Sequence, residues 1–155
     1  MPHYLRLLIV VADGEHARFV RAKQDNALYT DAAFDSAAAH KRSSDLGSDH
    51  PGASFHTGST VRNSIAPEHD LHDQEKEKFA HYVAKEINEA AIAGTFDELV
   101  IVAPAHSLNA IRAALDPAAE TKIIGTLAKD LVKTPDHELQ PHVSEWVRAV
   151  DRSGH

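Results

Sequence analysis

Imidazole and carboxylate side chains gather between positions 50 and 73 of this chain. His56, His69, His72 and Asp73 offer the nitrogen and oxygen donors that zinc and other divalent metals take as ligands. His69 and His72 are three residues apart, so one helical turn would present both on the same face. Alternatively, these side chains are solvated at a loop and a helix start, with His72 and Asp73 capping the helix. The pattern therefore predicts no obligatory cofactor and leaves a site for zinc or another divalent metal open.

A second group of chemically competent residues follows the two most apolar runs of the chain. Asp13 and Gly14 follow the first run, and His106 follows the second. The carboxyl ends of parallel strands meet at a crevice of an open α/β sheet, where ligands usually bind. An Asp13–His106 pair there could act as general base and orienting group, and free N–H groups of a helix start could bind an anion. No Ser or Cys nucleophile motif accompanies the pair, and the structural alternative is a hairpin turn beside an ordinary helix N-terminus.

A polar segment rich in Gly, Ser and His lies between about positions 37 and 70. The usual connection in a small domain has ~4–6 residues, so a segment of this length is either functional or mobile. Within it, His50, Gly58, Ser59 and Arg62 are candidates for contacting a ligand, and the Arg62 guanidinium could contact RNA phosphates. The alternative is that these side chains are simply solvated.

Composition narrows the class of protein. The 155 residues carry a net charge of −7 and include no cysteine. The lack of cysteine excludes disulfides, thiolate metal sites and cysteine nucleophiles. The negative charge argues against a broad nucleic-acid-binding face, so we expect no DNA partner, although a local basic patch for RNA remains compatible. The apolar run Leu5–Ala12 lacks a basic leader, and no run approaches the ~18 residues that span a bilayer. We expect a cytoplasmic protein with no membrane partner.

The periodicity of apolar residues predicts the elements that would position these groups. Strands are expected at Leu5–Ala12, His16–Ala22, Ala27–Phe34, Leu99–Ala103 and Lys122–Leu127. Helices are expected at Asp73–Ala93 with a cap at Gly94, after Pro104 up to Asp116-Pro117, and from Thr134-Pro135 onward with a break or kink at Pro141.

This order predicts one α/β domain over residues 1–155. An antiparallel meander followed by right-handed crossovers gives a mixed five-stranded sheet with helices on both faces. The two most apolar strands should lie side by side, in the ribonuclease H-like order 3-2-1-4-5, with the long loop between the third strand and the first helix. A two-metal nuclease is not expected, because the second of these strands ends in Ala103-Pro104 and not in an acid.

Five stretches of the chain resemble the bacterial host-attachment protein family. They are VVADGEHARFV, DLGSDHPGASF, DLHDQEKEKFA, FDELVIVAPAHSL and KDLVKTPDHEL, which occur in the family's order over most of the chain. That family is similar to the middle domain of archaeal and eukaryotic peptide-chain release factors, whose long loop carries a Gly-Gly-Gln tip. Here the equivalent region reads Gly58-Ser59-Thr60-Val61-Arg62, with one glycine and no glutamine, and Gln74 replaces a second histidine of the family pattern.

The resemblance implies a translation-associated, release-factor-like domain without the residues for peptidyl-tRNA hydrolysis. The resulting hypothesis is a non-catalytic interaction domain whose Gly/Ser/His-rich loop binds RNA, the ribosome or a protein partner. One alternative is a metal-dependent or His/Asp-based hydrolase that acts at the loop and the edge of the first strand. A third is a binder of a small anionic ligand at the crevice of Asp13 and His106.

Overall fold

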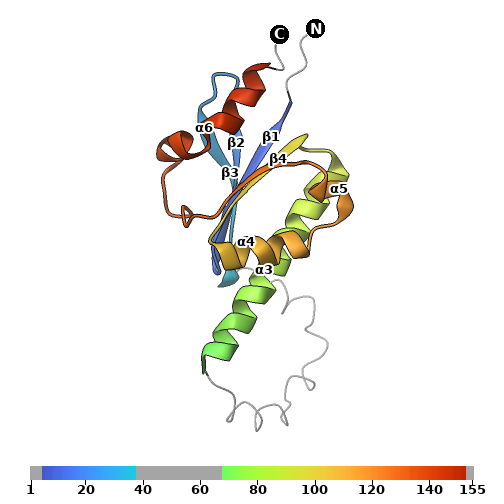
Figure 1. Cartoon of the computed structure of the whole chain (residues 1–155), viewed down its shortest axis with the longest axis vertical. Helices are drawn as coiled ribbons and strands as arrows, with labels where there is room; N and C mark the ends of the chain where they lie inside the picture. The colour runs from blue at the N-terminus through green and yellow to red at the C-terminus, as the bar shows by residue number, and fades with distance from the viewer. Residues whose placement is uncertain (1–4, 38–67, 153–155) are drawn as a thin grey trace.

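A computed structural model describes residues 5–37 and 68–152 of the chain, and the side chains of residues 5–37 and 74–147. The labelled elements are β1 (Leu7–Ala12), β2 (His16–Ala22), β3 (Leu28–Asp35), α3 (Glu68–Ala93), β4 (Glu98–Val102), α4 (Ala105–Ala113), α5 (Pro117–Glu120), β5 (Ile123–Leu127) and α6 (Asp136–Arg152). Figure 1 shows their arrangement. Within these ranges, no helix is long and apolar enough to cross a membrane.

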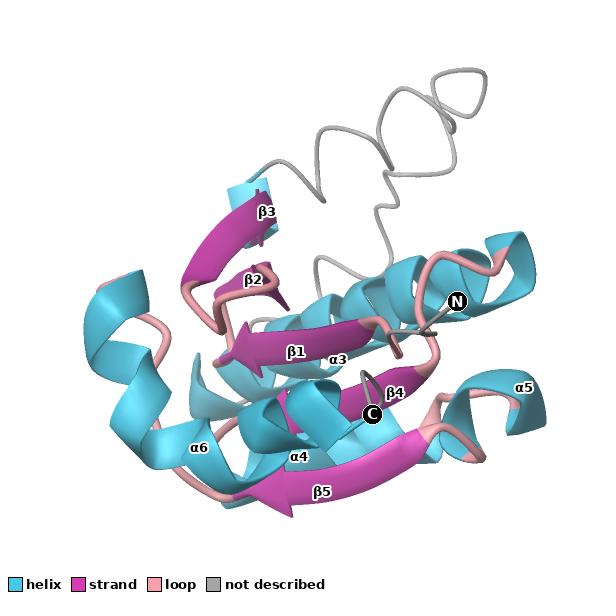
Figure 2. Ribbon diagram, turned by 90° about the horizontal axis from the view of Figure 1, so that it is seen from above, coloured by secondary structure: helices cyan, strands magenta, loops and turns pink. Residues whose placement is uncertain are grey.

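The five strands form one mixed sheet in the order β3-β2-β1-β4-β5, which confirms the predicted topology (Figure 2). β1 pairs antiparallel with β2 and parallel with β4, so the two most apolar strands are neighbours at the centre. The predicted turn at Asp13-Gly14 connects β1 to β2, and the Asp13 N–H donates to the His16 carbonyl at 2.8 Å. Another turn connects β2 to β3, and Asn26 adopts a left-handed φ of 71° within it.

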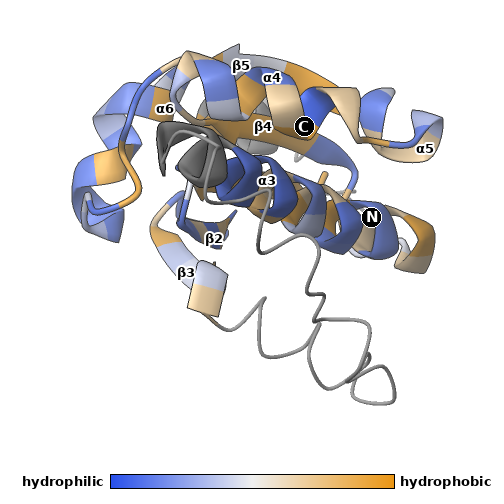
Figure 3. Cartoon of the chain, turned by 90° about the horizontal axis from the view of Figure 1, so that it is seen from below, coloured by the Kyte–Doolittle hydropathy of each residue, from blue (hydrophilic) through white to orange (hydrophobic). Residues whose placement is uncertain are grey.

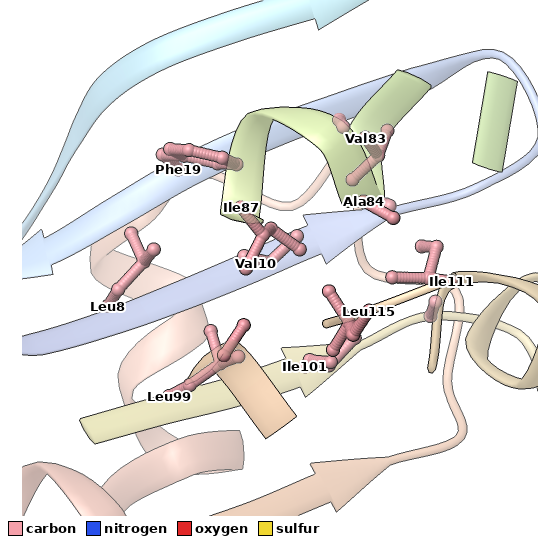
Figure 4. Close-up of a cluster of buried hydrophobic side chains, with 14 of the residues drawn as sticks. Leu8, Val10, Phe19, Val83, Ala84, Ile87, Leu99, Ile101, Ile111 and Leu115 are labelled. Carbon is pink, nitrogen blue, oxygen red and sulfur yellow. The ribbon is translucent and has the colours of Figure 1, made fainter. Parts of the chain in front are cut away.

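Every residue of β1 is buried because both faces of the sheet are covered. Leu8, Val10 and Ala12 pack in a cluster with side chains of α3, α4 and β4, part of which is drawn in Figure 4. Leu7, Ile9 and Val11 point to the opposite face, where α6 supplies its own apolar residues. Figure 3 shows the corresponding hydrophobic colouring of β4 and a largely hydrophilic outer surface on α3. Helices therefore lie on both faces, as predicted.

The helix α3 is the longest element and begins five residues before the predicted Asp73. Its 26 residues correspond to about 39 Å at ~1.5 Å per residue. The buried positions begin at Phe79, whereas Gln74 and residues 76–78 are exposed. In Figure 1 the N-terminal part of α3 accordingly extends beyond the edge of the sheet. The helix ends at the predicted cap, where Gly94 adopts a left-handed φ of 74°.

The predicted break at Pro141 is wrong, since α6 runs continuously from Asp136 to Arg152 with Pro141 inside it. The predicted kink is compatible with the curved ribbon of α6 in Figure 2. Only one backbone donor is missing there, and buried Leu139 and Val143 on either side hold the helix against the sheet. Asp116-Pro117 does more than end α4, because Pro117 occupies the first position of the short helix α5.

Arg18 connects the sheet to the start of α6. Its guanidinium donates to the Asp136 carboxylate at 2.8 Å and to the backbone carbonyls of Leu131, at 3.2 Å, and Thr134. Asp136 in turn accepts hydrogen bonds from the backbone N–H and the hydroxyl of Thr30 on β3, at 2.9 and 2.7 Å. One side chain of β2 therefore fixes the segment that leads into α6.

Candidate functional site

A pocket of about 340 Å³ lies beyond the C-terminal ends of β1, β4 and β5. Gly14 belongs to the turn after β1, His106 to the first turn of α4, and Lys76 reaches in from α3. The structure thus brings the candidates Asp13, Gly14 and His106 to one pocket. Its full lining is Asp13, Gly14, Glu15, Lys76, Pro104, His106, Ser107 and Asp130.

The Asp13 carboxylate is occupied by its own turn. One oxygen accepts hydrogen bonds from the backbone N–H groups of Glu15, at 2.8 Å, and His16, at 2.7 Å. The His16 ring nitrogen Nδ1 lies 3.7 Å from the same oxygen. An aspartate that accepts hydrogen bonds from the residues two and three positions later stabilises a tight turn. Asp13 therefore has a structural role in the β1–β2 connection.

His106 has a different partner. Its imidazole is 69% exposed, and Nε2 lies 3.7 Å from the Glu77 carboxylate on α3. Asp13 and His106 thus line the same pocket without forming the hydrogen-bonded pair that a base and its orienting group require. Backbone N–H groups of the turn occupy one oxygen of the Asp13 carboxylate, and the His106 ring lies beside Glu77 instead.

Two pocket residues that sequence reasoning missed are Lys76 and Ser107. The aliphatic stem of Lys76 lies over Gly14, since a Cβ on Gly14 would be 2.7 Å from the lysine Cγ. Ser107 is only 7% exposed although it is polar. Ser107 is the third residue after the helix-starting Pro104 and adjoins the candidate His106, which is a signal that could have identified it. Lys76 gives no such signal, because it comes from an element distant in sequence.

The predicted metal ligands lie only partly within the described chain. His50, His56, Gly58, Ser59 and Arg62 all fall in residues 38–67, outside the described ranges. His69, His72 and Asp73 fall on the first turns of α3, but their side chains are not described. Among the side chains that are described, no group of three or more His, Asp or Glu could hold a metal ion. The metal site therefore stays a prediction.

A second hollow runs along the exposed face of α3. Its volume is about 650 Å³, and its lining residues recur at helical spacing: Gln74, Glu77, Lys78, His81, Tyr82 and Lys85. The ring of Tyr82 stacks on Phe79, with centroids 6.1 Å apart, and meets Phe34 of β3 edge-on at 5.8 Å. Tyr82 is thereby held against the core while Lys78, His81 and Lys85 remain exposed. We refer to these six residues as the α3 groove.

Comparison with known proteins identifies a family and similar solved structures. The family model described as "Protein required for attachment to host cells" matches residues 8–143. The crystal structure of the archaeal translation termination factor aRF1 is similar, with a TM-score of 0.48 and 10% sequence identity. That similarity covers 95% of this chain and 40% of the factor, so the chain spans less than half of the factor's length. None of the curated proteins matches the chain.

Proposed function

Because the chain belongs to the family of proteins required for attachment to host cells, we propose that it is a non-catalytic interaction domain. In this proposal the partner is a ribosome or another RNA-containing particle, which contacts the segment 38–67 and the adjoining half of α3. Such a partner requires a cytoplasmic location. The family description names a cellular behaviour, which is attachment to host cells. A domain that binds a partner is a molecular role compatible with that behaviour.

The observation that carries the proposal is the projecting half of α3. Residues 74 and 76–78 are exposed, and the buried stripe of the helix begins only at Phe79. Since the core contacts of the described side chains begin at Phe79, packing on the core does not account for the exposed positions 74 and 76–78. Its N-terminal end also adjoins the long polar segment that the sequence analysis identifies as the candidate contact region. This part of α3 extends beyond the edge of the sheet (Figure 1).

The α3 groove supports an RNA-containing partner. Lys78 and Lys85 are exposed cations two helical turns apart, and His81 and Tyr82 lie between them. Cations that contact phosphates, together with rings on which bases stack, are the usual elements of single-strand recognition. The net charge of −7 restricts such contacts to a local patch of this kind.

The absence of catalysis is proposed from the pocket beyond β1 and β4. A general base there would need a free carboxylate or an oriented imidazole. Asp13 already accepts two backbone hydrogen bonds, and the His106 ring lies beside Glu77 at the protein surface. Both side chains thus have partners that favour structural or binding roles.

Cosedimentation with ribosomes at low salt tests this proposal. The intact chain should pellet with ribosomes, and the bound fraction should fall as salt rises, because phosphate contacts release counterions. Deleting residues 48–63 should abolish binding, and the double variant Lys78→Ala/Lys85→Ala should weaken it several-fold. The matched control is Lys129→Ala/Lys133→Ala, which removes two exposed lysines elsewhere and should bind like the intact chain.

Two results would contradict the proposal. One is no cosedimentation at low salt, measured against a protein known to bind ribosomes. The other is binding that neither the deletion nor the α3 variant reduces relative to the control variant. Circular dichroism of each variant establishes that a loss of binding does not come from unfolding.

A further inference from the structure

We propose that two copies of this chain associate through the side of β5 that faces away from β4, which we call the β5 edge. The two β5 strands then pair antiparallel and join the two sheets around a two-fold axis. This self-association goes beyond the interaction role proposed above and does not rest on it. It depends on the unpaired backbone of β5, on the absence of charge along that strand, and on the protection of the opposite edge of the sheet.

The β5 edge presents backbone groups without a partner in the described part of the chain. β5 is the last strand of the sheet and pairs only with β4, and Figure 2 shows it at the outer border. The Leu127 carbonyl accepts the Ala103 N–H at 3.0 Å, so Leu127 faces β4. Successive residues of a strand direct their backbone groups to opposite sides, so Thr126 faces away from β4. No hydrogen bond between described residues reaches the Thr126 backbone from that side.

The side chains of β5 carry no charge that would oppose pairing. The strand reads IIGTL, and Ile124 is 38% exposed. The register with β4 shifts before Gly125 and is regular from there to Leu127. Ile123 packs against the layer of α3 and α4, whereas Leu127 packs against the layer of α6, so the strand is held from both faces. An uncharged edge strand with an exposed apolar side chain is a template for pairing with another strand.

The other edge strand, β3, has the features that prevent such pairing. Asp31 and Asp35 are exposed along it. Its register with β2 is irregular between Phe19 and Val20. The Thr30 N–H donates to the Asp136 carboxylate at 2.9 Å, so part of this edge is already covered. Charged side chains, a bulge and a covered backbone are the usual protection of edge strands. The contrast between the two edges therefore identifies β5 as the strand that takes a partner.

The charges that flank β5 favour a second copy as that partner. In antiparallel pairing centred on Thr126, Lys122 of one copy lies near Asp130 of the other, and this contact occurs at both ends. Lys129 falls beside Ile123 in the same register. Each copy carries a net charge of −7, but none of that charge lies on β5 itself. A contact built on a strand of 5 residues is smaller than a standard interface, so we expect a weak, reversible dimer.

Sedimentation velocity of the full chain at increasing concentration tests the proposal. We expect a monomer–dimer equilibrium with a Kd on the order of 10–100 µM. Ile124→Lys should raise this Kd at least ~10-fold, because each copy then brings an unpaired charge to the contact. Thr126→Pro should have a similar effect because it removes the central backbone donor. Proline is tolerated in an edge strand where the N–H faces outward, so this variant should still fold.

The matched control is Ile92→Lys, which makes the same change at an isoleucine of α3 that is 77% exposed and should leave the Kd unchanged. Thermal unfolding of each variant separates lost association from lost folding. Native-state hydrogen exchange gives a second measurement that does not depend on a variant. Exchange of the Thr126 amide should slow as the concentration of the chain rises, and exchange of the Thr30 amide should stay the same.

Three results would overturn the proposal. One is a chain that stays monomeric at about 0.5 mM. Another is a dimer whose Kd rises no more in folded Ile124→Lys than in Ile92→Lys. The third is exchange of the Thr126 amide that does not depend on the concentration of the chain.

Discussion

Replacing Arg18 with methionine should destabilise the protein strongly, although Arg18 lies in no predicted site. The change removes four hydrogen bonds of the guanidinium, to Asp136, Thr30, Leu131 and Thr134. Methionine retains most of the aliphatic stem, so the lost interactions are mainly polar. The carbonyls of Leu131 and Thr134 then lose the Arg18 donor at the start of α6, and the Asp136 carboxylate keeps only its hydrogen bonds from Thr30.

The expected loss in the free energy of unfolding depends on how well the Arg18 and Asp136 side chains are shielded from water. The side chains of Arg18 and Asp136 are 15% and 30% exposed, which places the pair between a surface and a buried ion pair. Surface pairs contribute up to ~1 kcal/mol, whereas breaking a buried pair costs ~3–5 kcal/mol. We therefore expect a loss of about 2–4 kcal/mol for Arg18→Met, or roughly 10 °C in Tm for a chain of this size. Asp136→Asn keeps the shape and should cost about 1–2 kcal/mol.

Urea unfolding followed by tryptophan fluorescence measures these values. The chain has a single tryptophan, Trp146, which packs on Gly125 and reports directly on the contact between α6 and the sheet. The matched control is Arg6→Met, which breaks the Arg6–Asp97 ion pair, whose side chains are 56% and 34% exposed. Because that pair is solvated, its loss should cost less than about 1 kcal/mol.

The double variant Arg18→Met/Asp136→Asn completes the measurement. If the two side chains stabilise the same contact, the double variant should be less destabilised than the sum of the single variants by about 1 kcal/mol or more. The reasoning is refuted if Arg18→Met is no more destabilising than Arg6→Met, or if the effects of Arg18→Met and Asp136→Asn simply add.

Three further predictions concern single positions. Gly125→Ala should destabilise the protein by about 1–3 kcal/mol and change Trp146 fluorescence, because the new Cβ would lie 2.2 Å from the indole ring. Gly94→Ala should cost about 1 kcal/mol in urea unfolding, since its φ of 74° strains any side chain although the space around it is open. Hydrogen bonds from Arg6 lower the pKa of Asp97. The stabilisation of the fold by the Asp97 carboxylate is therefore present above the ordinary pKa of 3.8, and it is lost as the pH falls through the lowered pKa. Asp97→Asn should remove that part of the acid dependence of unfolding, which is less than about 1 kcal/mol for so exposed a pair; an unchanged acid dependence would contradict the assignment.

The sheet could be predicted because its determinants are local. The run Leu5–Ala12 is apolar at nearly every position, which indicates a strand covered on both faces, and Asp13-Gly14 marks a tight turn directly after it. The same argument applies to Leu99–Ala103, and a right-handed crossover then makes the two strands neighbours. Gly94 could be identified as a helix cap because few other residues tolerate its φ.

The other features of the fold and of the pocket depend on contacts between distant parts of the chain. The propensity of Pro141 to break a helix is overridden by the packing of its neighbours on the sheet. The role of Arg18 requires a loop more than a hundred residues away, and no local pattern indicates it. The ends of the two apolar strands indicate that Asp13, Gly14 and His106 lie at one edge of the sheet. Lys76 joins the same pocket only because α3 crosses the turn at Gly14, and Ser107 is distinguished only by its burial.

The alternation of β1 between two layers has an experimental consequence. Ile9 contributes to the cluster under α6, and its neighbour Val10 contributes to the cluster under α3. Truncating one or the other side chain removes contacts from a single layer without changing the strand pairing. Native-state hydrogen exchange of Ile9→Val and Val10→Ala would therefore tell whether the two helical layers open together or as separate units.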